Sequence, residues 1–438
     1  MTKTLTAVLS VLLLNCLIPL PAAAQTDAEY LSAVNFRFSN PGARARGMGG
    51  NLVALADDDA TAAFVNPAGF AGFDEMQFTV EAIAEEDRFP APRVETGLAF
   101  SSGGLQPARA PERPTIETDS NFLSFASFLM PVRSNKLGFG FFYARPLDTQ
   151  TESVGVSIDA AFFPEFDPAF IFFPVTSQVE AKNEVFGVAA GYRLNKKLSV
   201  GVAVGLSRLE FAGSSQRGDF LDPTTILNSQ SSLVDGEEDL FLTLGGLWKF
   251  ADGWTLGASW QKQTGYDMTS QSSSSNEVLR SEFTIPTRSA LGLAYKRGLW
   301  TFGVEADFIQ YSDLFAEVLG QTFFGNVTPD PTYGYEIPDA IELHLGVEYI
   351  LPITAENQIW SLRAGVWRDE THVPYYTGQD PNLRAWAPRL EEDIYHWTLG
   401  LGLEAPRYAV GVAADITSDE GTDLLVSLLL RPRGRSKG

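Results

Sequence analysis

The chain has 438 residues, more than one small domain needs but a suitable length for a single large barrel. Its formal net charge of -22 at pH 7 argues against nucleic acid as a partner, because phosphate binding requires clustered cations. Apolar residues make up 45% of the chain, and they alternate with polar residues rather than forming long blocks.

The first 24 residues have the pattern of a secretory signal peptide. Lys3 precedes an apolar run at residues 9–20, and alanines at 22–24 follow it. The single cysteine, Cys16, lies inside this segment behind Asn15, where a lipoprotein signal requires a small residue. The mature chain is therefore expected to contain no thiol, no disulfide and no lipid anchor.

After the signal, no window approaches the roughly 18 uninterrupted apolar residues of a membrane helix. The pattern that begins near residue 76 is instead an alternation of apolar and polar residues, which is typical of strands with two different faces. In residues 341–349, isoleucine, leucine, valine and tyrosine at odd positions alternate with glutamate, histidine and glycine at even positions. Fourteen such strands are expected, at 75–85, 120–131, 136–146, 179–193, 197–211, 238–250, 254–268, 282–296, 299–313, 339–351, 358–370, 393–404, 407–416 and 422–431.

The connections between these strands are short and long in turn. Short connections are expected at 131–136, 194–197, 250–254, 296–299, 351–358 and 404–407, and long ones at 147–178, 213–237, 314–339 and 371–393. An even strand number with alternating short and long connections is the pattern of an outer-membrane barrel with tight periplasmic turns and large external loops. The sequence therefore predicts an all-β fold, a transmembrane antiparallel β-barrel of about fourteen strands.

A segment rich in small residues, 42–73, precedes the strands. It contains an apolar and acidic run at 54–58 and two motifs, Gly47-Met48-Gly49-Gly50 and Asn66-Pro67-Ala68-Gly69. This segment resembles the N-terminal hatch of the outer-membrane long-chain fatty-acid transporter (FadL-like) family. The resemblance continues in the strand signatures around Pro286, Pro338 and Arg363, and it covers most of the mature chain.

The resemblance implies a division of the chain into four parts: a signal peptide at 1–24, a hatch or plug inside the lumen at 25–73, the barrel at 74–431 and a basic tail at 432–438. Barrels of this kind usually finish on a C-terminal aromatic residue, whereas residues 424–430 of this chain lead into the basic tail, which puts the usual assembly signal in doubt. A lumen this wide has to be filled, and the plug is expected to fill it. Its predicted gating residues are Gly47, Gly49, Gly50, Asn66, Pro67 and Ala68, and the alternative is a structural cork without a moving part.

The connection at 147–178 is unusually apolar for an external loop. Its prolines argue against a regular wall strand, and exposed phenylalanines are costly in water unless they cover something or bind an apolar ligand. We therefore expect either a landing site for a hydrophobic substrate or loop residues that pack on one another. The predicted ligand-binding residues are Phe162, Phe163, Phe166, Phe170, Phe172 and Phe173.

Parity places nine charged or histidine residues on the inner face: Arg288, Glu305, Asp307, Glu342, His344, Glu348, Arg363, His396 and Asp415. Buried carboxylates need cationic partners, and the plug supplies Arg37, Arg44 and Arg46, so a salt-bridge network that seats the hatch is the first interpretation. A more specific interpretation is that Arg363 or Arg288 binds a substrate carboxylate. The spacing of the histidines matches no metal-ligand motif, so no metal and no cofactor are expected.

The predicted function is passive uptake of hydrophobic small molecules, long-chain fatty acids first, across the bacterial outer membrane. The mechanism implied by the resemblance is capture at an apolar external surface, hatch rearrangement and exit through a gap in the wall. Outer-membrane lipid and lipopolysaccharide are the other expected partners, and nucleic acid is not. The alternatives are a structural or secretion-associated barrel that binds proteins and, with less support, a lipid hydrolase that uses Ser361 with His344 or His396. No G-x-S-x-G motif supports an enzyme.

Overall fold

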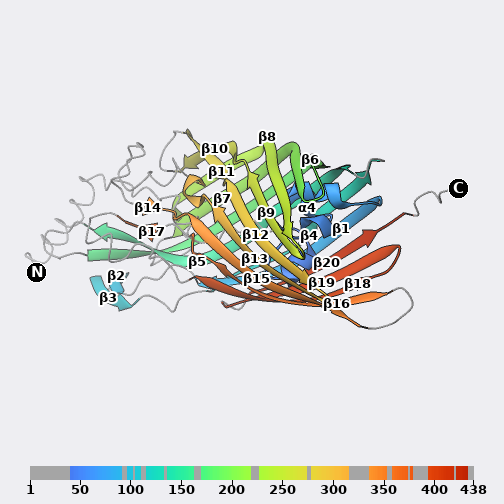
Figure 1. Cartoon of the computed structure of the whole chain (residues 1–438). Coiled ribbons are helices and arrows are strands. Elements are labelled where there is room, and N and C mark those ends of the chain that lie inside the picture. The colour runs from blue at the N-terminus through green and yellow to red at the C-terminus, as the bar shows by residue number, and fades with distance from the viewer. Residues whose placement is uncertain are drawn as a thin grey trace, which may run out of the picture.

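The wall of the protein is one continuous antiparallel sheet that closes on itself (Figure 1). The structure, a computed structural model, describes residues 40–90, 96–101, 104–109, 115–132, 136–161, 169–218, 226–273, 278–314, 335–352, 358–372, 375–377, 393–418 and 421–432. Its wall strands are β1 (Gln77–Pro90), β4 (Thr115–Pro131), β5 (Leu137–Ala161), β6 (Ala169–Arg193), β7 (Leu198–Gly218), β8 (Ile226–Ala251), β9 (Trp254–Gln261), β10 (Thr264–Ser272), β11 (Val278–Ile285), β12 (Arg288–Arg297), β13 (Trp300–Ile309), β15 (Ala340–Leu351), β16 (Ile359–Asp369), β18 (Ile394–Glu404), β19 (Tyr408–Thr417) and β20 (Thr422–Leu430).

These segments make fourteen wall strands, because β9 with β10 and β11 with β12 are each one strand with a two-residue interruption. Pro286 lies in the second interruption, where its missing N–H removes a ladder donor. The barrel closes where β1 pairs with β20, from Phe78 opposite Leu430 to Glu86 opposite Thr422. All fourteen predicted strands are confirmed.

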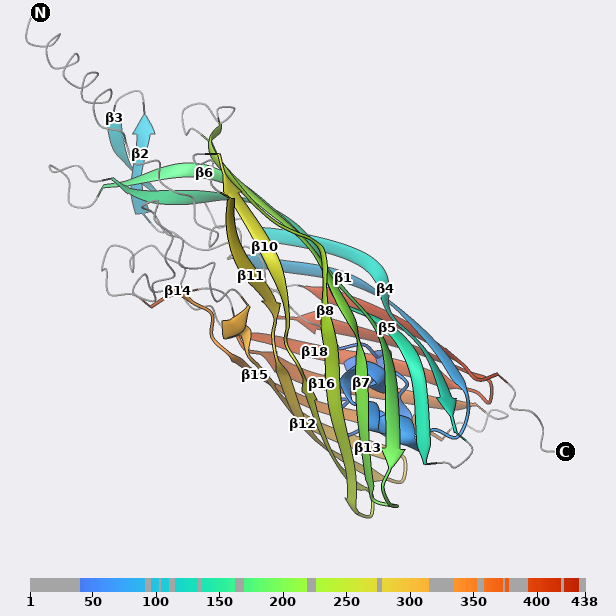
Figure 2. The ribbon, with the colours of Figure 1, turned by 90° about the horizontal axis from the view of Figure 1, so that it is seen from above.

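Four further strands and one helical turn lie outside this count. They are the hairpin of β2 (Thr96–Ser101) and β3 (Gly104–Arg109), the short pair β14 (Tyr335–Glu336) and β17 (Tyr375–Tyr376), and η3 (Tyr311–Asp313). The hairpin joins the end of the molecule that also carries the tips of β5 and β6 (Figure 2). Among the described residues, no helix is both long enough and apolar enough to cross a lipid bilayer.

Two of the predicted external loops are largely strand. β5 and β6 are paired as far as Ala161 opposite Ala169, and β7 with β8 as far as Gly218 opposite Ile226, so both hairpins continue the wall beyond the predicted strand ends. Prolines do not prevent this extension. Pro174 lies in β6 just beyond the last pairing with β7, at Val175, and there an absent N–H costs no ladder bond on that side.

Alternation along each strand separates a lipid-facing surface from a lumenal one. In β13, Phe302 and Val304 at even positions are about half exposed, whereas Glu305 and Asp307 at odd positions are buried. Apolar side chains at the outer positions suit contact with the bilayer, and closure of the sheet pairs most backbone polar groups of the wall.

The cost of placing a charge on this outer surface should depend on its depth in the bilayer. Two leucines of nearly equal exposure test this. Leu345 lies midway along β15, and Leu233 lies on the extended part of β8, opposite Thr269. We expect Leu345→Arg to destabilise the folded barrel by about 2–4 kcal/mol, because the guanidinium meets hydrocarbon. Leu233→Arg should stay within about 0.5 kcal/mol. Urea unfolding in lipid vesicles measures both, and equal effects would contradict the placement of the membrane.

Candidate functional site

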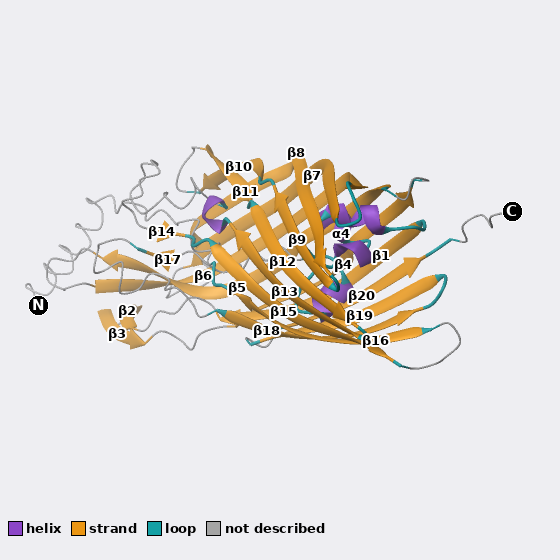
Figure 3. Cartoon of the chain, viewed as in Figure 1, coloured by secondary structure: helices purple, strands orange, loops and turns teal. Residues whose placement is uncertain are grey.

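The residues that fill the lumen form a compact plug between Asn40 and Phe73. Its elements are α3 (Ala43–Gly47), η1 (Ala56–Asp58), α4 (Ala62–Val65) and η2 (Pro67–Gly72). The helical turns lie inside the wall, toward the end of the barrel from which the C-terminus leaves (Figure 3). Almost all of the plug is buried, including Met48, Ala56 and Phe70 with no measurable exposure.

The plug follows the inner wall around the lumen in the reverse order of the strands. α3 packs on β18 and β19, and η2 packs on β6, β7 and β8. At these crossings a wall glycine faces plug backbone or, at Gly245, the Asn66 side chain, so that a Cβ atom there would collide with the plug. Such glycines include Gly138, Gly191, Gly201, Gly245, Gly257, Gly346 and Gly365.

Many of these wall glycines are direct cross-strand partners of one another. Gly191 is opposite both Gly138 and Gly201, and Gly201 is opposite Gly245. The result is a belt of bare sheet on which the plug backbone rests. We call these residues the glycine belt.

The six predicted hatch residues all lie on the plug face that meets the wall. Asn66 is fully buried, donates from Nδ2 to the Val53 and Gly246 carbonyls, and accepts at Oδ1 from the Ala68 N–H. Pro67 and Ala68 rest on Gly201 of the belt, and Gly47 rests on Gly400. The Asn-Pro motif therefore begins η2 and binds the plug to β8.

The glycine pair in the GMGG motif is required by backbone conformation and by space. Gly49 has φ +71° and lies against the backbone of β15 and β16, where its N–H donates to Thr398 Oγ1 at 2.9 Å. Gly50 has φ +85°, and a Cβ atom there would come within 2.8 Å of His344 Nδ1. A side chain at either position would be both strained and crowded.

Wall carboxylates hold the plug by charged interactions, as the sequence predicted. Arg44 binds Glu348 in a bidentate manner at 2.7 and 3.1 Å, and Arg46 binds Asp415 at 3.0 Å. Arg37 lies outside the described residues. Two further carboxylates accept directly from plug N–H groups, which the sequence did not reveal: Glu81 from Gly42 and Ala43, and Glu305 from Leu52 and Val53.

The two arginines predicted to bind a substrate carboxylate are both engaged by protein carboxylates. Arg363 donates to Glu348 at 2.8 Å, and Arg288 donates to Asp307 and to Asn40. Both therefore belong to the network between wall and plug, and their role toward a ligand stays a prediction.

The phenylalanines of the predicted capture loop are divided between two situations. Phe162, Phe163 and Phe166 lie outside the described residues. Phe170, Phe172 and Phe173 lie on β6, opposite Ala160, Ile158 and Ser157 of β5, so this part of the predicted loop is a two-stranded extension of the wall. Their role as ligand contacts stays a prediction.

Pairing between wall strands is interrupted between β8 and β10, at residues 234–242 and 262–268, and also between β4 and β5. Strands β4 and β5 pair from Phe125 opposite Ala144 to Pro131 opposite Gly138, and again at Glu117 opposite Glu152. Between these two regions, residues 118–124 and 145–151 are described and form no strand pair with each other. We call this interruption the β4–β5 window.

Two compensating bulges border the β4–β5 window. Ser124 is an extra residue of β4 relative to β1, and β5 has one residue more than β6 across Arg145 and Pro146. Because each strand gains one residue, the β4–β5 register is the same above and below the window. Pro146 offers no N–H to a ladder, and bulges re-aim side chains and end pairing locally.

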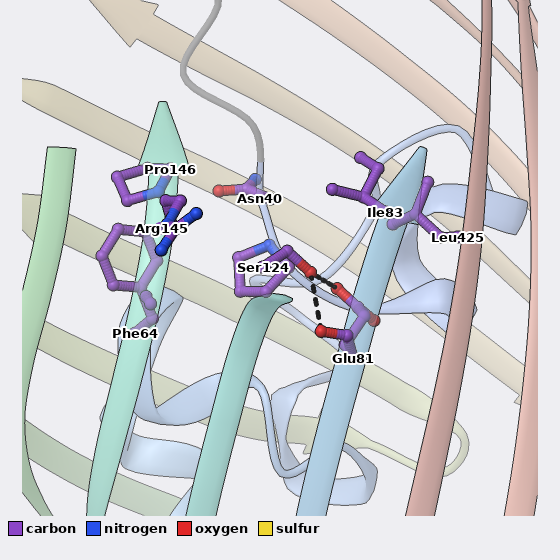
Figure 4. A pocket seen from close by; sticks show the side chains of 10 residues that line it. Asn40, Phe64, Glu81, Ile83, Ser124, Arg145, Pro146 and Leu425 are labelled. Atoms are coloured by element: carbon purple, nitrogen blue, oxygen red, sulfur yellow. Dashed lines mark hydrogen bonds between the residues drawn. The ribbon is translucent and has the colours of Figure 1, made fainter. Parts of the chain in front are cut away.

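A small pocket lies between the window and the plug. About 250 Å³ of space not filled by atoms, some of it open to solvent, is lined by Ser124, Arg145 and Pro146 from the window and by Asn40, Pro41 and Phe64 from the plug. Figure 4 shows Ser124 donating to Glu81, the carboxylate that also accepts from Gly42. Glu81 thus connects the start of the plug to the edge of the window.

Arg145 is the cation of this pocket. Its guanidinium binds Asp148 at 2.7 Å and Glu184 at 2.8 Å, and it lies 5.6 Å from the ring centre of Phe122 on β4. Glu81, Ser124, Arg145 and Pro146 were not predicted from the sequence. A proline inside an alternating strand was the one available signal.

A second missed feature is an apolar cluster contributed by the part of the wall from β5 to β15. Its members are buried inward-facing side chains, and they form one contiguous cluster: Leu147, Val179, Ala181, Leu209, Phe211, Val234, Tyr266, Met268, Phe283, Ile285, Ile309, Tyr311, Leu314, Ile337 and Ala340. Two of them, Leu147 and Val234, lie on the parts of β5 and β8 that extend beyond the predicted strand ends. The inner surface on this side of the plug therefore carries a contiguous apolar patch.

The candidate hydrolase residues are not assembled into a catalytic pair. His344 and His396 are both opposite Trp367 of β16, whereas Ser361 lies six residues earlier on that strand. Six residues of extended chain span about 20 Å. A Ser-His pair at hydrogen-bond distance is therefore excluded for Ser361.

Comparisons with known proteins agree with this architecture. Residues 22–379 match the family model described as "Outer membrane protein transport protein (OMPP1/FadL/TodX)". A FadL homologue from Pseudomonas aeruginosa superposes with a TM-score of 0.62 at 15% identity, over 90% of this chain and 99% of that one. The toluene transporter TbuX from Ralstonia pickettii superposes with a TM-score of 0.52 at 14% identity, over 90% and 99%. No curated protein sequence matches.

The glycine belt makes a prediction with a matched control on one strand. A Cβ atom at Gly245 would collide with Asn66 Oδ1, whereas one at Gly246 would have Ser199 O, 4.0 Å away, as its nearest neighbour. We expect Gly245→Ala to cost about 1–3 kcal/mol of overpacking and to loosen the plug. Gly246→Ala should behave as wild type. Limited proteolysis of the plug in the folded barrel is the measurement, and equal protection of the two variants would contradict the belt.

Proposed function

Because the chain belongs to the OMPP1/FadL/TodX family of outer-membrane transport proteins, we propose that it takes up long-chain fatty acids by a route that ends at the β4–β5 window. The family transports hydrophobic compounds across the outer membrane, and its members are channels, not enzymes. The observation that carries the proposed route is the interruption of the wall directly beside a pocket at the plug.

Entry is proposed at the extended hairpin of β5 and β6. Phe162, Phe163, Phe166, Phe170, Phe172 and Phe173 give this region an apolar character that favours capture of a hydrophobic molecule from the cell surface. The next surface on the route is the lumenal apolar cluster, which begins on the same strands at Leu147 and Val179. A hydrocarbon chain gains free energy along this path because it leaves water.

The plug closes the axial route, and this supports a lateral exit. The plug backbone rests on the glycine belt on most sides and is tied to Glu81, Glu305, Glu348 and Asp415, so a passage to the periplasm would require many charged contacts to break together. Opening of the wall at the β4–β5 window requires fewer contacts to break. Within the window the ladder is already unpaired, and the pocket behind it is closed by few groups.

Glu81 is the proposed point of gating. It accepts from the N–H groups of Gly42 and Ala43 and from Ser124 Oγ, so a displacement of the plug start also displaces the edge of the window. Arg145 supplies a positive charge at the pocket, suited to a fatty-acid carboxylate if that group displaces Asp148 or Glu184. No energy source is needed, because the ligand moves down its own concentration gradient.

A reversible seal across the window tests the route. In a continuous ladder Asn121 would stand opposite Asp148, because the register is the same on both sides of the window. We expect Asn121→Cys with Asp148→Cys, joined by a short bis-methanethiosulfonate crosslinker, to lose fatty-acid uptake about tenfold or more. Reduction should restore uptake, because it cleaves the disulfide bonds between the crosslinker and the two cysteines. The only native cysteine is Cys16, so no other thiol interferes.

Phe128→Cys with Phe141→Cys is the matched control for that seal, because these two residues are already direct partners on the same strands. Crosslinking them should leave uptake unchanged. Undiminished uptake through the sealed window would overturn the lateral exit without affecting the fatty-acid assignment.

The substrate is tested by ligand identification. Native mass spectrometry and lipid extraction of the detergent-purified protein should detect bound fatty acid, and Phe170→Asp with Phe172→Asp should weaken it several-fold, because two carboxylates replace apolar surface. Competition with toluene distinguishes an aromatic hydrocarbon as the ligand. A barrel that binds neither compound and instead co-purifies with a protein would favour the structural or secretion-associated alternative.

A further inference from the structure

We propose that Asp307, Glu342 and His344 form a binding site for a divalent transition-metal ion of the zinc class, on the inner wall of the barrel where it meets the plug. The three residues lie on β13 and β15, and one ligand atom of each can be chosen so that all lie within 4.8 Å of one another. This site goes beyond uptake, and it holds whether or not the lateral route is correct.

The strand register places like charges face to face. Asp307 is the direct cross-strand partner of Glu342, and Glu305 is the partner of His344. Carboxylates directly opposite each other destabilise a sheet unless a cation lies between them. All four side chains are at least nine-tenths buried, so water does little to screen the repulsion.

The hydrogen bond of His344 to the plug determines which of its nitrogens faces these carboxylates. Nδ1 lies 2.6 Å from the carbonyl oxygen of Gly49, and a carbonyl only accepts, so Nδ1 carries the proton. In a neutral ring, Nε2 then offers a lone pair. It has no hydrogen-bond partner among the described residues, and it faces Glu342 Oε2 at 3.5 Å and Asp307 Oδ2 at 3.6 Å.

Three groups with lone pairs directed at one another require a positive charge between them. The separations of 3.5 and 3.6 Å agree with the edge of a tetrahedral zinc site, about 3.4 Å for ligand bonds of 2.0–2.2 Å. A histidine that binds metal through one nitrogen and donates the other N–H to a backbone carbonyl is the usual arrangement around zinc.

The local charge also favours a divalent ion. Glu305, Asp307 and Glu342 bring three negative charges, and Arg288, which donates to the same Asp307 Oδ2 that faces His344 Nε2, brings one positive charge. Asp307 Oδ1 and Glu305 Oε1 are buried without a hydrogen-bond partner among the described residues, so acceptor capacity remains. A dication balances the two negative charges left over. A proton on His344 balances only one.

Metal binding would hold the plug through the imidazole. Nε2 would bind the ion while Nδ1–H donates to Gly49 of the hatch, so the ion, the ring and the plug backbone form one chain of contacts. Glu305, the neighbour of His344, accepts from Leu52 and Val53 of the same plug segment. The amides of residues 48–53 should therefore exchange more slowly when the site is loaded.

The experiment uses the full-length barrel in detergent, stripped of metal with a chelator and then titrated with ZnCl₂. One zinc per chain is expected by elemental analysis. Co²⁺ in its place should give the intense visible bands of a tetrahedral site, and hydrogen exchange at residues 48–53 should slow several-fold on loading.

His344→Gln and Glu342→Gln are expected to lower the zinc affinity at least tenfold. His372→Gln is the matched control, because His372 is also buried, stacks on Tyr311 and lies outside the cluster, so its zinc binding should equal that of the wild type. Wild-type protein that retains no zinc and shows no tetrahedral Co²⁺ spectrum would overturn the site and assign the positive charge to a proton on His344. Zinc binding unchanged in both variants would also overturn it. The Co²⁺ spectrum of the wild type decides the question even if a variant fails to fold.

Discussion

The close contact between the plug backbone and the wall glycines is the constraint on which the rest of the structure depends. An aliphatic side chain at Gly201, Gly257 or Gly346 would occupy space that plug backbone now occupies. The wall therefore gives up side-chain packing at one level of the barrel and gains a bare sheet on which an irregular segment can lie. Because the plug contributes its own Phe64 and Phe70 to the lumen, this level is still filled with apolar groups.

Backbone this deep inside a barrel must have its N–H and C=O groups satisfied, and this explains where the wall places its acids. Glu81 and Glu305 each accept from two successive plug N–H groups, which is the kind of interaction a helix N-terminus offers to an anion. Arg44 and Arg46 neutralise the acids of β15, β19 and β20. Several carboxylates of this acidic chain are therefore structural and lie in the lumen.

The same contacts connect the plug to the β4–β5 window. A plug bound to every strand could not move, and the barrel would stay closed. A window without a contact to the plug would stay open. Glu81 couples the plug to the window, because it binds the first plug residues on one side and Ser124 at the bulge on the other. The cluster at His344 lies across the lumen from this window on β15, where it binds Gly49. The plug is thus attached at several separated points, and a hinge at one of them leaves the others in place.

The sequence alone determined the local features of this protein. A period of two with apolar outer faces identified all fourteen strands and the inward orientation of Glu305, Asp307 and Asp415, because alternation is a property of each strand by itself. The family resemblance indicated the hatch, and its arginines were predicted to bind carboxylates of the wall, as Arg44 and Arg46 do. The ends of β5 to β8 were misplaced, because the prolines of 147–178 argued against a wall strand and the mainly polar residues of 213–237 show no outer apolar face.

Only the tertiary structure decided what depends on register between strands. The window arises because Ser124 and Pro146 border the same opening from different strands, and neither bulge is informative without its partner. The cluster of Asp307, Glu342 and His344 arises because β13 and β15 pair at one register and not at the next. The glycine belt matters only because the plug circles the wall at that height. A single sequence records the residues on each strand, whereas the alignment of strands that are distant in sequence is set when the sheet closes.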